Sequence, residues 1–426
     1  MGKHDNNGDT HRPGQPIPPD KKGRRQHRWR RKEGEVTASE LVRRLRDGGD
    51  LRGPEWERAM HAAPRHLFAP DRGWCVPDGG GAAFAIDRSA DPERWREAAY
   101  ADAAIITQVD DGAGDPASGQ GAWTSSLSAP GAVVSFLELL APRDHDRVLE
   151  ISTGTGWTAA LLSSRLGAGR VTSLEVDARV AERAAANLRE AGFAPDLVVG
   201  DGEEGVPARA PFDRVHVTCG VTVLPPSWIE QTRPGGVILF PWMPSFGDGH
   251  KARLTVTGDG RAIGRFHGSA DYMMLRSQRS PGFGDLGRDG DETRTRLDPR
   301  SVTRGSYGAD VAIAGMLPDV LGGERIVRGR PSLVLVDEAG TSWARCSYRA
   351  GADDFPVVQG GERRLWDEVE AAYLRWVGWG SPGRDRFGLV AGPEGLRVWF
   401  ERPSNVIGGG GARRYGVTSG MGREWW

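Results

Sequence analysis

Short apolar runs alternate with longer amphipathic segments through the middle of the chain, from Val148 to Phe240. The apolar runs are typical of buried strands, and the amphipathic segments have the length and spacing of helices. After an opening strand at Val148, the predicted elements are helix Trp157–Leu166, strand Val171–Glu175, helix Ala178–Ala191, and strands Leu197–Val199, Val215–Val217 and Val237–Phe240. Strands and helices that alternate in this way form a parallel sheet, so we predict a doubly wound, Rossmann-like α/β core.

The pattern before and after this core is less regular. A helical pattern starts at Thr37, a strand-like run spans Tyr100–Val109, and a helix is expected at Val133–Leu140. Beyond the core, Arg253–Thr257 and Ala262–Phe266 are joined by a Gly-Asp-Gly turn and are predicted to form a hairpin.

A second unit, of α+β character, is predicted nearer the C-terminus. It contains a hairpin at Leu333–Asp337 and Trp343–Tyr348, and a second hairpin within Leu389–Phe400. Between them, large apolar residues recur at helical spacing from Leu365 to Val377. We interpret that stripe as a core-facing helix rather than a ligand site.

Changes in composition predict where these units begin and end. Residues 1–34 are polar and basic, which is typical of an arm without fixed structure. The other predicted parts are a catalytic domain at 35–276 with its cofactor core at about 145–245, a linker at 277–300, an α+β substrate-recognition domain at 301–407 and a flexible tail at 408–426. The basic cluster Lys21–Lys32 could contact nucleic acid or an acidic peptide, but a solvated arm is the favoured interpretation.

Charge and cysteine usage argue against several classes of protein. The formal net charge of −1 disfavours a nucleic-acid or membrane-surface protein. The three cysteines are far apart and the nine histidines show no paired spacing, so neither a disulfide framework nor a metal site is expected. No apolar run reaches the roughly 18 residues that cross a membrane. We therefore expect a soluble, cytoplasmic protein, and the sequence leaves its oligomeric state open.

The stretch VLEISTGTG, from Val148 to Gly156, is the main candidate for a binding site. A buried strand, a glycine turn and a helix N-terminus together form a pocket suited to nucleotide-type ligands. Gly154 and Gly156 have no Cβ atoms, so we expect a ligand to lie against the main chain there. By itself this glycine spacing also fits a dinucleotide site.

Three acidic positions narrow the choice of ligand. Glu150 lies within the strand end, where it would repel a dinucleotide phosphate but attract an ammonium and a sulfonium group. Glu175 ends the second strand, where it can accept both ribose hydroxyls, and Asp201 follows the third strand, near an adenine amino group. This pattern describes S-adenosylmethionine binding. The predicted cofactor-binding residues are Glu150, Thr153, Gly154, Gly156, Glu175, Asp201 and Gly202.

The chemistry expected beside this cofactor is methyl transfer to a carboxylate. A carboxylate with a pKa of about 4 is already ionised near neutral pH, so it needs no catalytic base. Ser128, just before the core, is the predicted catalytic residue, because its hydroxyl can orient the acceptor. Alternatively, Ser128 could have a structural role as the N-cap of the helix that starts near Pro130, and the two roles are compatible.

Other acceptors are less well supported. Amino-group methyltransferases place an Asp/Asn-Pro-Pro-aromatic set after the fourth strand, whereas this chain has Thr218–Val221 there. Cys219 could suggest cytosine methylation, but the second motif of such enzymes is absent, and a small buried cysteine is the favoured interpretation.

Between about Trp56 and Arg276 the chain resembles the protein-L-isoaspartate O-methyltransferase family. The matching stretches are ArgHisLeuPheAlaPro, AlaTyrAlaAsp at 99–102, SerAlaPro at 128–130, the glycine loop, ThrSerLeuGluValAsp at 172–177, GlyAspGly at 200–202, AlaProPheAsp at 210–213 and ArgProGlyGly at 233–236. The resemblance implies that Ser128 is the active-site serine and that the acids and glycines above line the cofactor. Ser152 departs from the family, which usually has glycine there, and the stretch Asp110–Gly121 is longer and looser.

The chain continues well beyond the point where an ordinary repair enzyme of that family ends. This extension resembles an actinobacterial branch found with ribosomally made lanthipeptides, lasso peptides and graspetides. The resemblance implies methylation of an aspartate in a cyclised precursor peptide, followed by aspartimide formation and possibly hydrolysis to isoaspartate. Two alternatives stay open: repair of isoaspartyl residues in damaged proteins, and a non-catalytic cofactor- or peptide-binding protein. A nucleic-acid methyltransferase is the weakest alternative.

Overall fold

The computed structural model of the protein describes residues 37–280, 282–283 and 290–408. The arm predicted at 1–34 and nearly all of the tail predicted at 408–426 lie outside the described residues. Among the helices of the described part, none is long and apolar enough to cross a membrane.

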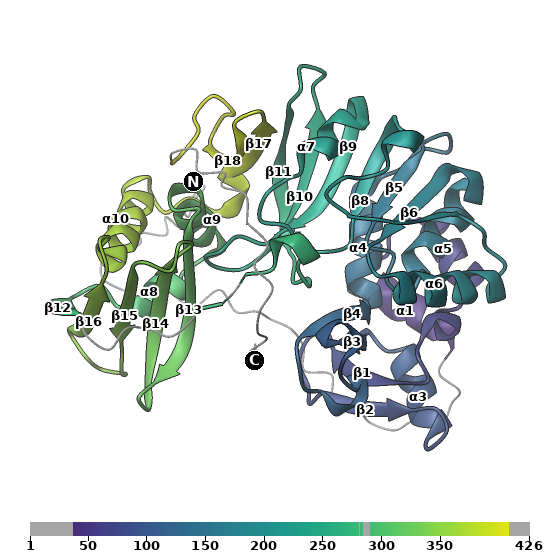
Figure 1. The fold of residues 1–426 in the computed structure, drawn as a ribbon, viewed down its shortest axis with the longest axis horizontal. Coiled ribbons are helices and arrows are strands. Elements are labelled where there is room, and N and C mark those ends of the chain that lie inside the picture. Colours follow the sequence, from purple (N-terminus) through teal and green to yellow (C-terminus); the bar gives the residue numbers. More distant parts are fainter. Residues whose placement is uncertain (1–36, 281, 284–289, 409–426) are drawn as a thin grey trace, which may run out of the picture.

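The predicted doubly wound sheet is present at the centre of the molecule (Figure 1). Its parallel part runs in the order β9-β8-β5-β6-β7. The strands are β5 (Val148–Ile151), β6 (Val171–Glu175), β7 (Asp196–Val199), β8 (Phe212–Val217) and β9 (Thr232–Trp242). Each connection between parallel strands passes over a face of the sheet, so every residue of β5 and β8 is buried, including the polar residues of β8.

Two hydrophobic cores lie on opposite faces of this sheet. One side packs against α4 (Pro130–Leu140), α5 (Trp157–Leu166) and α6 (Ala178–Glu190). The other side packs against α7 (Pro226–Glu230) and the C-terminal part of the chain. Neighbouring residues of β5 alternate between the cores, with Val148 in the first and Leu149 in the second. This alternation follows from the period of two in a strand.

The sheet continues beyond β9 with four antiparallel strands. The predicted hairpin is confirmed as β10 (His250–Val256) and β11 (Ala262–Ser269). The last two strands, β17 (Phe387–Gly392) and β18 (Gly395–Phe400), come from far along the chain, and β17 pairs with β11. The hairpin predicted within Leu389–Phe400 is therefore present, but it belongs to the central sheet rather than to a separate unit.

The region before β5 forms a small antiparallel sheet of order β2-β1-β3-β4. Its elements are α1 (Ala38–Gly48), α2 (Pro54–Ala62), β1 (Arg72–Pro77), β2 (Phe84–Asp87), α3 (Pro92–Ala99), β3 (Ala103–Val109) and β4 (Trp123–Leu127). The sequence pattern predicted β3 but missed the other three strands. β4 ends at Leu127, so this sheet delivers the chain to Ser128 and the start of α4.

The C-terminal unit is a five-stranded antiparallel sheet of order β12-β16-β15-β14-β13, covered by helices (Figure 1). Its elements are β12 (Asp291–Thr295), α8 (Pro299–Thr303), α9 (Tyr307–Met316), β13 (Val320–Val327), β14 (Arg330–Asp337), β15 (Trp343–Ser347), β16 (Phe355–Gly360) and α10 (Leu365–Gly378). The predicted apolar stripe is confirmed, because Leu365, Trp366 and Val369 of α10 are buried.

One predicted boundary differs from the structure. The stretch 277–300 was predicted to be a linker, yet β12 lies inside it and pairs with β16 along its length. β12 has the sequence DETRT and is mostly exposed, so it shows no apolar alternation that could have indicated a strand. The wider division between 35–276 and 301–407 stays a prediction.

Candidate functional site

The glycine loop leaves β5 through a series of left-handed residues. Ser152, Gly154 and Gly156 have φ values of +74°, +56° and +87°, and α5 begins directly afterwards. A non-glycine residue in this region costs about 1–2 kcal/mol, so Ser152 is the strained position of the loop. Thr218 helps to hold it there, since its hydroxyl donates to the carbonyl of Ser152 at 2.6 Å.

The two glycines serve protein packing more directly than the sequence indicated. A Cβ atom at Gly156 would lie 3.1 Å from the side chain of Leu188 on α6. A Cβ atom at Gly154 would lie 3.4 Å from the carbonyl oxygen of Ser126 on β4. The missing side chain of Gly156 therefore allows α6 to approach the loop closely, and the expectation that a ligand lies against the main chain here stays a prediction.

Glu150 is fully buried and only half satisfied. Its Oε2 accepts a hydrogen bond from the Ser173 hydroxyl at 2.6 Å, and that hydroxyl also lies 2.6 Å from Thr153 Oγ1. Among the described residues, Oε1 of Glu150 has no hydrogen-bond partner. Burial raises the pKa of this carboxyl group to about 8, despite the bond from Ser173. A buried oxygen without a partner is unusual, and a ligand cation that donates hydrogen bonds would satisfy it.

Glu175 ends β6 and holds the glycine loop. One carboxylate oxygen accepts the backbone N–H of Gly154 at 2.9 Å, and the other accepts the backbone N–H of Asp177 at 3.1 Å. Burial raises the pKa of Glu175, and the Gly154 and Asp177 bonds oppose that shift. Each oxygen keeps a further lone pair, so the same carboxylate could also accept hydrogen bonds from ligand hydroxyls.

Asp201 and Gly202 follow β7 at the same carboxyl edge of the sheet. Asp201 is exposed and accepts the N–H of Glu203 at 3.0 Å. Gly202 is buried, and a Cβ atom there would lie 3.2 Å from Ile151 of β5, so it is close to the start of the loop. The apolar side chains of Val176 and Val199 are exposed at this edge, 37% and 57% respectively. An apolar surface beside a carboxylate suits a flat aromatic base with an amino group.

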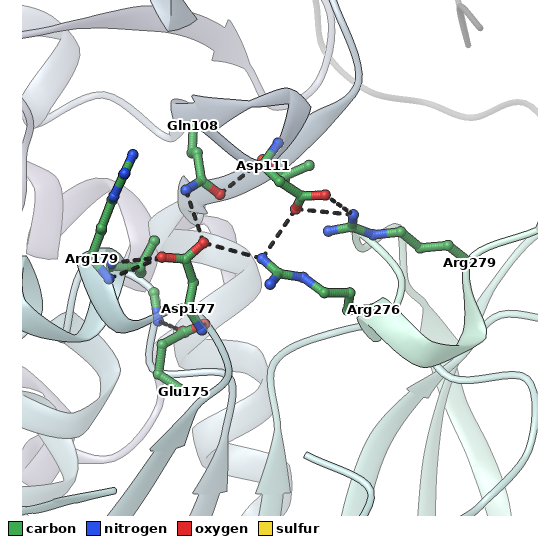
Figure 2. A network of polar contacts seen from close by, with 10 residues as sticks. Gln108, Asp111, Glu175, Asp177, Arg179, Arg276 and Arg279 are labelled. Atoms are coloured by element: carbon green, nitrogen blue, oxygen red, sulfur yellow. Dashed lines mark hydrogen bonds and ion pairs between the residues drawn. The ribbon is translucent and has the colours of Figure 1, made fainter. Parts of the chain in front are cut away.

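A polar network lies beside Glu175 and joins three distant segments (Figure 2). Asp177 accepts hydrogen bonds from Gln108 at 3.3 Å and from Arg276 at 3.2 Å. Asp111 forms ion pairs with Arg276 at 3.0 Å and with Arg279 at 2.8 Å. The segment that carries Arg276 is thereby tied both to the loop after β3 and to the start of α6.

The same segment crosses the carboxyl edge of the sheet. The N–H of Gly220 donates to the carbonyl of Met273, and the N–H of Leu275 donates back to the carbonyl of Gly220, each at 2.8 Å. Leu275 is buried against Gly202, where a Cβ atom would lie 2.8 Å from it. We call residues 271–279 the strap, because they lie across the strand ends that carry the predicted cofactor residues.

Ser128 lies between β4 and α4, with its side chain half-buried. The N-cap of α4 is Ala129 and it makes no side-chain cap, so the N-cap role considered for Ser128 is not observed. Within the described residues, its hydroxyl has no hydrogen-bond partner. The carbonyl oxygen of Ser126, two residues earlier, lies 3.4 Å from where a Cβ atom of Gly154 would be, so the chain that leads to Ser128 passes close to the glycine loop.

The structure adds residues that the sequence analysis did not identify as parts of the site. Gln108, Asp177 and Arg276 act through contacts between segments about 70 to 100 residues apart, which local patterns do not reveal. Arg65 belongs to the ArgHisLeuPheAlaPro stretch, which the sequence comparison with the family included without giving Arg65 a role in the site. Cys219 is buried, and burial raises the pKa of its thiol to about 12, as suits a packing residue rather than a nucleophile.

Comparisons of the sequence with known proteins lead to one family. The sequence model described as "Protein-L-isoaspartate(D-aspartate) O-methyltransferase (PCMT)" matches residues 81–278. A protein-L-isoaspartate O-methyltransferase from Methanopyrus kandleri is 32% identical over 241 residues, which cover 55% of this chain and 89% of the relative. Protein-L-isoaspartate O-methyltransferase 2 from Archaeoglobus fulgidus is 31% identical over 242 residues, 56% of this chain and 92% of the relative.

Solved structures with the same name are also similar to this chain. The alignment with one protein-L-isoaspartate O-methyltransferase covers 86% of this chain and 100% of that chain, with a TM-score of 0.49 and 19% identity. A putative enzyme of this kind from Plasmodium falciparum, in complex with S-adenosyl-L-homocysteine, has a TM-score of 0.44 and 13% identity. That match covers 56% of this chain and 98% of the Plasmodium chain.

Proposed function

Because the chain belongs to the protein-L-isoaspartate O-methyltransferase family, we propose that it transfers a methyl group from S-adenosylmethionine to a carboxylate on a peptide or protein. The observation that carries this proposal is the pairing of two features at one edge of the sheet. Within the described part of the chain, buried Glu150 has an oxygen without a hydrogen-bond partner, which suits a cationic cofactor, and Ser128 follows the segment whose Ser126 carbonyl lies close to Gly154.

The residues at the loop fit this cofactor. Glu150 would bind its ammonium group, Glu175 its ribose hydroxyls, and Asp201 its adenine amino group. Val176 and Val199 would contact the base. When bound, S-adenosylmethionine supplies a methyl group on a positively charged sulfur.

Ser128 would orient the acceptor in this proposal. A peptide carboxylate is already ionised near neutral pH, so the protein need not remove a proton from it. The serine hydroxyl donates a hydrogen bond to one carboxylate oxygen and leaves the other free to react. Holding that oxygen in line and excluding water then account for most of the rate enhancement.

We further propose that the acceptor is an aspartate side chain in one particular peptide, a cyclised ribosomal precursor. Support comes from the C-terminal sheet, because β12 to β16 lie beyond residue 278, where the family match ends. After methylation, the next backbone nitrogen attacks the ester carbonyl. A C–N bond forms, the C–O bond breaks, and methanol leaves with the amide proton, which gives an aspartimide that water can open to isoaspartate.

Repair of isoaspartyl residues in damaged proteins is the second candidate, and the family relationship favours it. A mass-spectrometric assay separates the two by offering a linear isoaspartyl peptide, its aspartyl twin and a macrocyclic aspartyl peptide. Gain of one methyl, followed by loss of one water relative to the starting aspartyl macrocycle, would support the precursor-peptide function. Turnover of the isoaspartyl peptide alone would support repair. No methylation of any peptide, together with no calorimetric binding of S-adenosylhomocysteine, would leave the non-catalytic alternative.

The raised pKa of Glu150 predicts that cofactor binding releases a proton. In the folded protein this group keeps its proton up to about pH 8, whereas its ordinary pKa is 4.5. The folded state therefore holds more protons than the unfolded state across that window, and the stability of the unliganded protein falls as pH rises through it. A bound cation favours the ionised form, so the affinity should rise with pH over the same window.

Calorimetry with S-adenosylhomocysteine in two buffers of different ionisation enthalpy measures this proton release. We expect a Glu150→Gln variant to bind without it. Equal release by the variant and the original protein would contradict the assigned contact between Glu150 and the ligand.

The ion pairs of the strap predict slow release of the cofactor product. Arg276→Met removes the pairs with Asp111 and Asp177 but leaves the pair of Arg279 with Asp111. It should speed dissociation of S-adenosylhomocysteine several-fold, since a partly exposed ion pair contributes about 1 kcal/mol at most. Stopped-flow measurements should also show that added salt accelerates release from the original protein more than from the variant.

Arg304→Met is the matched control for this prediction, because Arg304 forms an ion pair with Glu324 in the C-terminal unit. It should leave the release rate unchanged. Identical release rates for Arg276→Met and the original protein would show that the strap does not hold the ligand.

A further inference from the structure

Arg65, in the short helix Arg65–Phe68, is a fully buried arginine. Within the described residues no carboxylate lies at salt-bridge distance from its guanidinium group, and Asp102 favours its charge only from farther away. Burial lowers its pKa to about 10. A buried charge is costly unless its hydrogen-bonding groups are satisfied, so the location of these bonds indicates what the residue does.

The guanidinium of Arg65 donates to backbone carbonyls from three segments. At the end of α3 it reaches Ala98 at 3.4 Å and Ala99 at 2.7 Å, and on β3 it reaches Ala103 at 2.7 Å. It also donates to Leu127 at 3.3 Å and to the carbonyl of Ser128 itself at 3.1 Å. The planar fork of an arginine can bind carbonyls arranged in this way, whereas a lysine presents its donors from a single point.

The same guanidinium also contacts the cofactor side of the site. It lies over the ring of Trp157, 5.5 Å from its centroid, and Trp157 is the first residue of α5 after the glycine loop. The indole N–H of Trp157 donates to the carbonyl of Ala63, two residues before Arg65, at 3.0 Å. Arg65 therefore bridges the backbone of Ser128 and the helix that starts at the loop.

We propose that Arg65 is a positioning residue for methyl transfer, which fixes Ser128 relative to the glycine loop by binding the carbonyls of Leu127 and Ser128 while it packs on Trp157. This inference rests on the role of Ser128 in the proposed function. Among the residues that the structure describes, the hydroxyl of Ser128 has no hydrogen-bond partner to fix its place, so the backbone must do so. Arg65 binds the two consecutive carbonyls that flank the Cα atom of Ser128.

A double-mutant cycle tests this role with whichever peptide the enzyme methylates. Arg65→Lys is expected to lower kcat about tenfold and to leave the affinity for S-adenosylhomocysteine within about twofold of the original value. In a Ser128→Ala background the same Arg65→Lys change should have almost no further effect, because both changes remove one function. Effects that multiply in the double variant would overturn the proposal.

Hydrogen–deuterium exchange with S-adenosylhomocysteine bound gives a second readout that does not depend on activity. Arg65→Lys and Arg65→Met should both speed exchange in the segment 125–133 and leave the segment 148–156 unchanged. A variant that loosens both segments equally, or that no longer binds S-adenosylhomocysteine, would show that Arg65 supports the whole domain, which contradicts the proposal. No change in either segment would contradict it as well.

Arg214→Met is the matched control. Arg214 is also a buried arginine, but it pairs with Asp146 at 3.0 Å, and both residues precede the strand ends that carry the site. Arg214→Met should lower the melting temperature. It should also lower kcat by a small factor that is the same whether position 128 is serine or alanine. If Ser128→Ala keeps the original kcat, both the proposed role of Ser128 and this inference about Arg65 are wrong. If Ser128→Ala lowers kcat and Arg65→Lys lowers it by the same further factor in the double variant, only the inference about Arg65 is wrong.

Discussion

Replacing Glu175 with glutamine is expected to weaken S-adenosylhomocysteine binding by about two orders of magnitude. The carboxylate accepts two backbone N–H groups, one on each oxygen, from Gly154 and Asp177. Glutamine has only one acceptor oxygen, so its NH₂ group would face one of these donors. An unsatisfied buried donor costs about 1–3 kcal/mol, and loss of charge-assisted bonds to the ribose costs a similar amount. The substitution would therefore destabilise the glycine loop and weaken ligand binding at the same time.

Isothermal titration calorimetry measures this effect directly. Glu182→Gln is the matched control, because Glu182 is exposed on the neighbouring helix α6 and should not change the affinity. Glu175→Gln with the original affinity would mean that the ligand does not lie at the end of β6.

Replacing Ser128 with alanine is expected to lower kcat by about tenfold to a hundredfold, the cost of one well-placed hydrogen-bond donor to a reacting oxygen. The affinity for S-adenosylhomocysteine should stay the same, because no predicted cofactor residue is touched. The fold should also be unaffected, since the hydroxyl makes no N-cap bond to α4.

Ser164→Ala provides the comparison for the serine prediction. Ser164 is also half-buried, but it lies on α5 away from the loop. Steady-state kinetics with one peptide should show a normal kcat for Ser164→Ala and a reduced kcat for Ser128→Ala. A reduced affinity for the cofactor product in place of a reduced kcat would assign Ser128 to the cofactor rather than to the acceptor.

The central sheet could be predicted from the sequence because its signal is local. Each buried strand is a short apolar run, and each helix repeats its apolar residues at a fixed spacing, so α5 and β6 match their predicted ranges. The small N-terminal sheet lacks this signal. β1 includes Gly73 and Pro77 and has a Trp and a Cys between them, so it shows neither a clear alternation nor an uninterrupted apolar run.

Contacts between distant segments explain what the sequence could not reveal about the site. The spacing of Gly154 and Gly156 indicates a tight turn, but only the fold shows that Leu188 and Ser126 occupy the space beside them. In the same way, an arginine in a loop gives no sign that it pairs with Asp111, as Arg276 does. The sequence shows which residue types are present, but the packing of distant segments determines which of these residues contact one another.

The pairing of β17 with β11 is a further consequence of packing. The hairpin itself was predictable from its Gly-Pro-Glu-Gly turn, yet its place at the edge of the central sheet was not. Because this hairpin follows the C-terminal unit in the chain, the unit is attached to the central sheet at both of its ends. A peptide-recognition role for the unit remains a proposal that the mass-spectrometric assay addresses.

The nature of the methyl acceptor tests the central claim most directly. The enzyme would be incubated with S-adenosylmethionine labelled in its methyl group and with the isoaspartyl, aspartyl and macrocyclic peptides, and the labelled product would then be made alkaline. A carboxyl ester releases its label as methanol, so we predict a peptide-bound label that is lost in base and that Ser128→Ala forms slowly. A label that survives base, or no transfer to any of these peptides by a protein that binds S-adenosylhomocysteine, would contradict the account.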